Sequence, residues 1–198
     1  MTEYRVHALF ANELPEWRSA MSNGTRRCIA TQRLPQQLDR MPIPKLAGSL
    51  EAWFESLDDA RAWAERTDRD YAPSATLTSE EFPLFDRRRT SSDIKGKFLF
   101  RRKPGMSVAE FRAYWLDRHG PIVLRTPEIL RYVQSHVLAN GARDPIYDGI
   151  TEIHWADFDA AVRSMGSREM TVEQAADAAQ FAAPRSVELV LVSEYELT

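Results

Sequence analysis

The sequence predicts an α+β fold made of two consecutive βαββαβ units, and three observations support this prediction. A near-repeat aligns residues 47–60 with residues 148–161 without a gap, 101 positions later. Within it, Gly48 corresponds to Gly149 and Phe54 to Trp155. Segments with strand and helix periodicity follow the same order around both copies. The length of 198 residues allows two small domains or one large one.

The second half, residues 93–198, shows the order of elements most clearly. Short segments rich in β-branched and aromatic residues predict strands at 97–101, 132–137, 149–155 and 187–195. Ser107 and Glu110 have the spacing of a capping box, which predicts a helix that Gly120-Pro121 then interrupts. A second helix is expected after Asp157, a residue type that caps helices.

The first half, residues 1–92, follows the same order more loosely. Strands are expected at 4–10, 27–32, 46–54 and 81–85. A short helix is expected at 15–21, and a longer one runs from Leu57 to Arg66 behind the cap residue Ser56. The charged stretch 87–93 is interpreted as the linker, so the predicted domains are 1–92 and 93–198.

A βαββαβ unit, the ferredoxin-like arrangement, puts both helices on one face of an antiparallel sheet. The other face has to be covered by something else. Two such units in one chain can pack their open faces sheet to sheet, which predicts an α/β barrel with a cavity.

The composition argues against several classes of protein. A net charge of −3 and a pI near 5.9 argue against a nucleic-acid binder. The single cysteine, Cys28, excludes an intrachain disulfide and a cysteine-rich zinc site. No run approaches the roughly 20 apolar residues of a membrane span, and no phosphate-binding glycine loop is present. We therefore expect a soluble, cytoplasmic protein with no membrane, nucleic-acid or nucleotide partner.

The polar residues of two predicted strands form the main candidate site. Strand alternation puts Tyr132, Gln134 and His136 on one face, and Glu152 with His154 on one face of the next strand. If the more apolar faces meet the helices, all five side chains face the cavity and form an acid/base pocket. The alternative is an ordinary solvated sheet face, and a slip of one residue would reverse the set.

His119 is the third histidine of interest, four residues after Trp115 at the end of the predicted helix. This spacing favours a role at the helix terminus. Glu152 and His154, with His136 or His119, offer the residue types of a two-histidine, one-carboxylate iron site. Nothing specifies the remaining geometry, so no metal site is predicted.

Residues 106–121, Met-Ser-Val-Ala-Glu-Phe-Arg-Ala-Tyr-Trp-Leu-Asp-Arg-His-Gly-Pro, resemble the signature of EthD-domain proteins. The shared features are a phenylalanine, a Tyr-Trp pair, and His-Gly-Pro at the helix end. The order of elements extends the resemblance over residues 96–198, whereas the first half lacks the motif. The resemblance implies a member of the dimeric α/β-barrel group, whose relatives include muconolactone isomerase and olivetolic acid cyclase and need no cofactor. It also implies that His119, the polar residue of the motif, is functional.

The resulting hypothesis is a cofactor-independent lyase or isomerase of the dehydratase, cyclase or decarboxylase type. It would act on a small hydrophobic, oxygenated or aromatic, polyketide-like substrate in the barrel cavity. The candidate acid/base residues are His119, His136, His154 and Glu152. The candidate substrate-binding residues are Tyr132, Gln134, Tyr147 and Trp53. The alternative is a non-catalytic protein that binds a hydrophobic ligand or assists a monooxygenase. A homodimer is compatible with either hypothesis.

Overall fold

The computed structural model of the chain describes residues 3–12, 14–15, 24–41, 44–87, 94–140 and 144–197. Apart from Pro15 and Arg87, the helix expected at 15–21 and the linker expected at 87–93 lie outside these residues. Within the described part of the chain, no helix has both the length and the apolar character needed to cross a membrane.

The chain forms two compact units that are interleaved in the sequence. Unit 1 comprises Met1–Glu81, Val137–Ile146 and Val190–Thr198. Unit 2 comprises Phe82–His136 and Tyr147–Leu189. Two strands, β4 (Ala75–Asp86) and β8 (Glu188–Glu196), each begin in one unit and end in the other.

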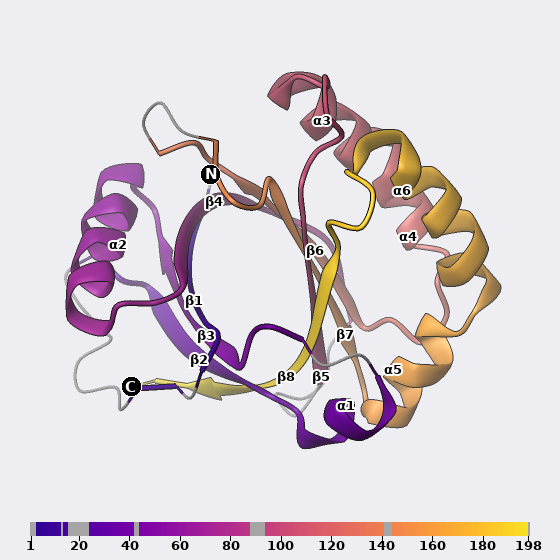
Figure 1. Cartoon of the computed structure of the whole chain (residues 1–198), viewed down its shortest axis with the longest axis horizontal. Helices are drawn as coiled ribbons and strands as arrows, with labels where there is room; N and C mark the ends of the chain where they lie inside the picture. The colour runs from indigo at the N-terminus through magenta and orange to yellow at the C-terminus, as the bar shows by residue number, and fades with distance from the viewer. Residues whose placement is uncertain are drawn as a thin grey trace. The chain divides into compact units, whose positions relative to one another are not determined.

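Unit 1 is a sheet with one long helix on one of its faces (Figure 1). Besides parts of β4 and β8, unit 1 contains β1 (Tyr4–Phe10), β2 (Arg27–Arg33), α1 (Pro35–Arg40), β3 (Gly48–Phe54) and the long helix α2 (Leu57–Tyr71). The strand order is β4-β1-β3-β2-β8, and neighbouring strands are antiparallel. The strands and the helix predicted after Ser56 are therefore present, and Ser56 caps α2 by accepting from the Asp59 amide.

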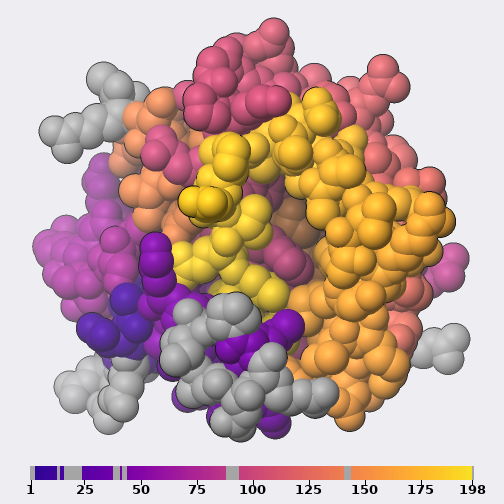
Figure 2. Space-filling view, turned by 45° about the vertical axis from the view of Figure 1, so that its right-hand side comes forward, coloured from indigo at the N-terminus to yellow at the C-terminus, as the bar shows by residue number. Residues whose placement is uncertain are grey.

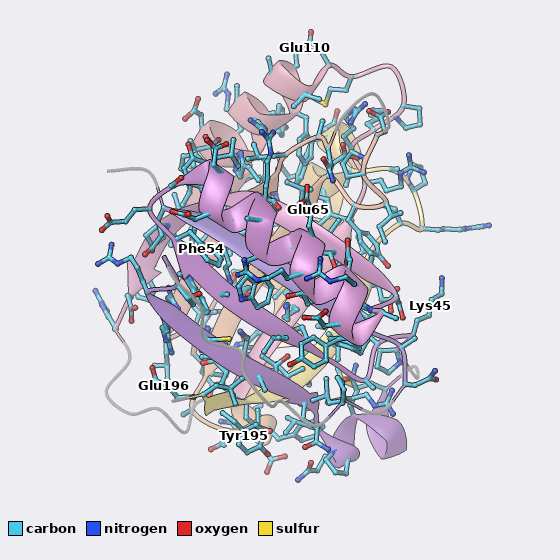
Figure 3. All side chains as sticks on the ribbon, turned by 90° about the vertical axis from the view of Figure 1, so that its left-hand side faces the viewer. Lys45, Phe54, Glu65, Glu110, Tyr195 and Glu196 are labelled. Atoms are coloured by element: carbon cyan, nitrogen blue, oxygen red, sulfur yellow. The ribbon has the colours of Figure 1, made fainter. Side chains whose placement is uncertain are left out.

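The core of unit 1 lies between the sheet and α2. Alternate residues of β1, namely Val6, Ala8 and Phe10, point towards the helix, which contributes Ala60 and Trp63. Figure 3 shows α2 lying across the strands, with Phe54 at the level of the sheet and the exposed Glu65 on the helix. This apolar face follows the period-two alternation of the sequence, as expected for a sheet covered on one side.

Unit 2 is a sheet covered by several short helical segments (Figure 1). Its strands are β5 (Ile94–Phe100), β6 (Arg131–Val137) and β7 (Gly149–Trp155), in the antiparallel order β5-β7-β6. The helices are α3 (Val108–Tyr114), η1 (Trp115–His119), α4 (Gly120–Val123), α5 (Phe158–Met165), η2 (Glu169–Gln174) and α6 (Ala175–Phe181). The segments η1 and η2 are wide, π-helical turns.

The helix predicted after Ser107 begins with the expected capping box. The prediction that Gly120-Pro121 interrupts it is wrong, because the helical conformation continues through η1 and α4 to Val123. Pro121 lacks an N–H, and the wide turn η1 directly before it replaces the regular i→i−4 pattern, so the helical conformation continues past the proline. The segments η2 and α6 were not predicted, although residues 169–181 contain no glycine or proline.

The two repeat-related glycines sit at the first residues of β3 and β7, where a side chain has no room. A Cβ on Gly48 would lie 2.0 Å from the Thr31 carbonyl oxygen. A Cβ on Gly149 would lie 2.7 Å from the Trp115 ring and 3.0 Å from the Phe100 ring. Close approach of backbone or aromatic rings therefore accounts for glycine at both positions.

We expect Gly149→Ala to lower the free energy of unfolding by about 1–3 kcal/mol, because the added methyl group overpacks the Trp115 contact. Urea unfolding followed by circular dichroism measures this change. Gly166→Ala is the matched control, since its Cβ would meet its nearest neighbour at 3.4 Å. Equal stability of the two variants would contradict the packing explanation.

Candidate functional site

A cavity of about 150 Å³ lies in unit 2 between the strands β5 and β7 and the helical segments η2 and α6. It is lined by Phe98, Phe100, His119, Thr151, Ile153, Met170, Gln174, Ala175, Ala178, Phe181, Ala182 and Val187. Only three of these described lining residues are polar: His119, Thr151 and Gln174. In Figure 2 the surface is hollowed beside the yellow and orange residues of this part of the chain.

His119 is the titratable group of the cavity wall, and a carboxylate fixes its orientation. Its Nδ1 lies 2.8 Å from Oδ2 of Asp177 on α6. The other oxygen of Asp177 accepts a 2.8 Å hydrogen bond from the hydroxyl of Tyr114. A carboxylate accepts only, so Nδ1 carries the proton and Nε2 is the basic nitrogen. Among the described residues Nε2 has no hydrogen-bond partner.

Two opposing effects set the pKa of His119. Burial is the larger and lowers the pKa below its ordinary value of 6.5, while the hydrogen bond and charge of Asp177 raise it. The imidazole is therefore neutral near pH 7, and Nε2 is available to accept a proton. The charge of Asp177 favours the protonated imidazole, so the pair has the geometry of a base with an orienting carboxylate.

The orientation of His119 depends on the wide turn η1. The first carbonyl group of this turn accepts two hydrogen bonds. The carbonyl oxygen of Trp115 accepts from the Gly120 amide, five residues further on. It also accepts a 2.9 Å hydrogen bond from Nε2 of Gln134 on β6. The same Gln134 nitrogen donates to the Tyr132 hydroxyl at 2.6 Å. Buried side chains of β6 thus support the turn that ends at His119.

His136 lies beside Gln134 on β6, and its contacts are with other buried side chains of the protein. Its Nε2 lies 3.0 Å from Oε1 of Gln134, and its ring stacks on Trp115 with centroids 4.6 Å apart. The Phe82 ring also covers the His136 ring, and the two ring centroids are 4.5 Å apart. Burial, with a smaller effect from the charge of Arg112, lowers the pKa of His136 to about 3. His136 is therefore neutral at physiological pH.

The prediction that His136 and His154 share one cavity is wrong. In the β6–β7 pair, Gln134 lies opposite Thr151, whereas Arg131 lies opposite His154. Directly opposed residues of antiparallel strands point to the same face. Tyr132, Gln134 and His136 therefore face the helices with Thr151, and His154 faces the other side. The expectation that the apolar strand face meets the helices fails on β6, where η1 supplies a carbonyl and an aromatic ring to the polar face.

Glu152 and His154 lie together on the sheet face that points away from the helices of unit 2. Oε1 of Glu152 is 3.6 Å from Nζ of Lys95 and 4.0 Å from Nζ of Lys97, and all three side chains are buried. A buried carboxylate requires such partners. These residues do not line the cavity that contains His119.

The remaining predicted site residues lie elsewhere. The Tyr147 hydroxyl donates to Glu188 at 3.0 Å, and burial is the main cause that raises its pKa to about 12. Trp53 belongs to unit 1, where its indole N–H donates to Glu81 at 2.6 Å and its ring lies beneath Arg5, 4.2 Å away. Neither residue lines the cavity of unit 2.

Sequence reasoning missed two kinds of polar group. The first is Asp177 with Tyr114; Tyr114 belongs to the quoted motif, but no local pattern connects either residue with His119. The second is a buried network in unit 1, in which Arg5 pairs with Glu51 and Ser49 donates to Glu51 at 2.6 Å. Alternating polar residues in β1 and β3 were its visible signal.

One family model matches a part of the chain. Residues 103–185 match the family model of the EthD domain, and this match includes the motif at 106–121 that resembles the EthD signature. No curated protein matches the sequence.

Solved structures show the fold. An anthrone oxidase-like protein superposes with a TM-score of 0.63 at 12% identity, covering 98% of this chain and 93% of that one. A chlorite dismutase from Candidatus Nitrospira defluvii gives 0.58 at 12% identity, covering 96% and 91%. An EthD family protein from Bacillus halodurans gives 0.42 at 16% identity, covering 50% and 95%. The first two likenesses span nearly the whole chain, and together with the antiparallel strands they confirm the coarser part of the prediction, a fold that combines helices with antiparallel β-strands.

We expect the stability of the protein to fall in acid partly because of His136. Below pH 6.5 the unfolded chain protonates this residue, whereas the folded protein does not until about pH 3. The free energy of unfolding should therefore fall by about 1.4 kcal/mol per pH unit between these values. Urea unfolding at pH 7.5, 6.0 and 4.5 measures the slope.

The His136→Gln variant should lose the part of this slope that comes from one proton. His119→Gln is the matched control, because it leaves the His136 contribution in place. Identical slopes for the wild type and His136→Gln would show that His136 is not buried in its neutral form.

Proposed function

We propose that the chain catalyses cofactor-independent proton transfer on a small, apolar, oxygenated substrate, as a lyase or isomerase. The observation that carries this proposal is the His119–Asp177 pair in the wall of a cavity that is otherwise mostly apolar. A neutral imidazole that is held by a carboxylate and exposed to an apolar cavity is suited to general acid–base chemistry.

In the proposed reaction, Nε2 of His119 removes a proton from a carbon beside a carbonyl group or from a hydroxyl group. Asp177 stabilises the imidazolium, and Tyr114 holds the second oxygen of Asp177. His119 then returns the proton to another atom of the substrate, which gives isomerisation, or to a leaving hydroxyl, which gives elimination. Thr151 and Gln174 supply the other polar groups of the wall that can bind a substrate oxygen.

The other predicted site residues take different roles in this proposal. Tyr132, Gln134 and His136 act behind His119, by holding the turn η1. Glu152 and His154 face the opposite side of the sheet, and the ion pairs of Glu152 with Lys95 and Lys97 support a structural role for this carboxylate. Tyr147 and Trp53 are assigned no contact with the substrate.

The two halves are proposed to be duplicated ferredoxin-like units. When the strands are numbered 1 to 4 within each half, both halves have the order 4-1-3-2. This order is β4-β1-β3-β2 in the first half and β8-β5-β7-β6 in the second. The steric need for Gly48 and Gly149 at equivalent positions supports the same interpretation. The cytoplasmic location and a homodimer stay predictions from the sequence.

A carrier function is the second candidate, because nine of the twelve described lining residues are apolar. Such a wall also suits a protein that binds a hydrophobic ligand without changing it. The presence or absence of proton exchange on a bound ligand separates the two functions.

We expect the protein to accelerate deuterium incorporation from D₂O into single-ring enolisable ketones such as cyclohex-2-enone, measured by proton NMR. His119→Gln should lower the rate by roughly 10²–10⁴-fold, because the positioned base is lost. Asp177→Asn should also lower it, because the carboxylate no longer stabilises the imidazolium. The rate should rise with pH to a plateau, with an apparent pKa below 6.5 that reports His119.

Asp117→Asn is the matched control for Asp177→Asn, since Asp117 is exposed and lies outside the cavity lining. Unchanged exchange in a folded His119→Gln protein would contradict the catalytic role of His119. Binding of the ketones without any exchange above the buffer rate would assign the carrier function.

A further inference from the structure

We propose that the cavity of unit 2 selects a neutral, single-ring hydroxyl compound, a phenol or the equivalent enol, whose O–H donates to Nε2 of His119. This inference rests on the proposed function, because it names the substrate class of that same site. It follows from the volume of the cavity, the shape of its wall and the charges around it.

The volume limits the ligand to one ring. The cavity measures about 150 Å³. An apolar protein cavity of about this size binds benzene. A second fused ring needs more volume than this, so it would have to extend out of the cavity or displace a lining side chain such as Met170. A ring with one or two small substituents therefore fits without repacking.

The wall is shaped for a flat ring. Phe98, Phe100 and Phe181 all line the cavity. The rings of Phe100 and Phe181 meet edge to face, with centroids 5.8 Å apart at an angle of 77°. Aromatic rings favour offset or edge-to-face contact with a further ring, which adds to the gain from apolar burial. A planar six-membered ligand satisfies this wall better than a branched aliphatic one.

The charges exclude an anion. Among the described residues that line the cavity there is no Lys or Arg. The carboxylate of Asp177 lies directly behind His119, 2.8 Å from Nδ1. A bound carboxylate would lose its hydration, gain no counter-charge and meet this negative group. The ligand must therefore be neutral.

The protonation of His119 sets the direction of its hydrogen bond. Asp177 holds the proton on Nδ1, so Nε2 accepts. A ligand that donates an O–H satisfies Nε2, whereas an ether oxygen of the same size leaves it unsatisfied. The site should thus separate phenol from anisole, which differ mainly in this donor.

The experiment is an NMR titration of the full chain at pH 7.5 with phenol, anisole, benzoate and 2-naphthol. We expect phenol to bind about tenfold more tightly than anisole, as for the loss of one buried hydrogen bond. Benzoate and 2-naphthol should cause no saturable shift. Tighter binding of benzoate or 2-naphthol than of phenol would overturn the proposal.

Three variants test the geometry. Ala178→Leu fills the cavity and should abolish phenol binding, whereas His119→Phe should make phenol and anisole bind equally. Met170→Ala enlarges the cavity and should admit 2-naphthol, a gain of binding that an unfolded variant does not show. Unchanged phenol binding in folded Ala178→Leu would place the ligand elsewhere and overturn the proposal.

The proposal and the proposed function fail in different ways. Selective phenol binding without proton exchange on any ring compound would contradict the catalytic function but support the ligand class. Exchange that depends on His119, on a larger or anionic substrate and without phenol binding, would support the catalytic function and overturn the ligand class.

Discussion

The backbone carbonyl of Trp115 is the group on which the geometry of the candidate site depends. In the wide turn η1 it accepts from the Gly120 amide and from the side chain of Gln134. A carbonyl oxygen has two lone pairs, and in this buried turn Gln134 of β6 supplies the second donor beside the Gly120 amide. The side-chain amide of Gln134 is held in turn by Tyr132 and His136. This chain of contacts fixes the turn that carries His119 to the cavity.

The same constraint explains why a polar strand face is packed under helices. Elsewhere the apolar alternate residues meet the helix, as Val6, Ala8 and Phe10 do in unit 1. On β6 the polar residues are buried instead, because each finds a partner: a carbonyl, a hydroxyl, an amide or a stacked ring. Buried polar groups are tolerated when they are satisfied, and they then specify a single arrangement.

The apolar wall of the cavity and the carboxylate of Asp177 act on His119 in opposite directions. Burial favours the neutral imidazole, whereas Asp177 favours the charged one, and burial is the larger effect. The result is a base that is neutral at rest and has a partner ready for its charged form. The pair lies in the part of the chain that matches the EthD domain, and His119 belongs to the motif at 106–121.

The sequence by itself determined the strands, the capped starts of α2, α3 and α5, and the resemblance of the segment around His119 to the EthD domain. Capping and strand periodicity depend on residues a few positions apart, so local patterns reveal them. Only the tertiary structure decided that His136 and His154 face opposite sides, and that Asp177 holds His119. A slip of the strand register by one residue turns every side chain of the strand to the other face of the sheet, and no local sequence pattern fixes the register. His119 and Asp177 are 58 positions apart, and only the packing of α6 beside η1 brings them together.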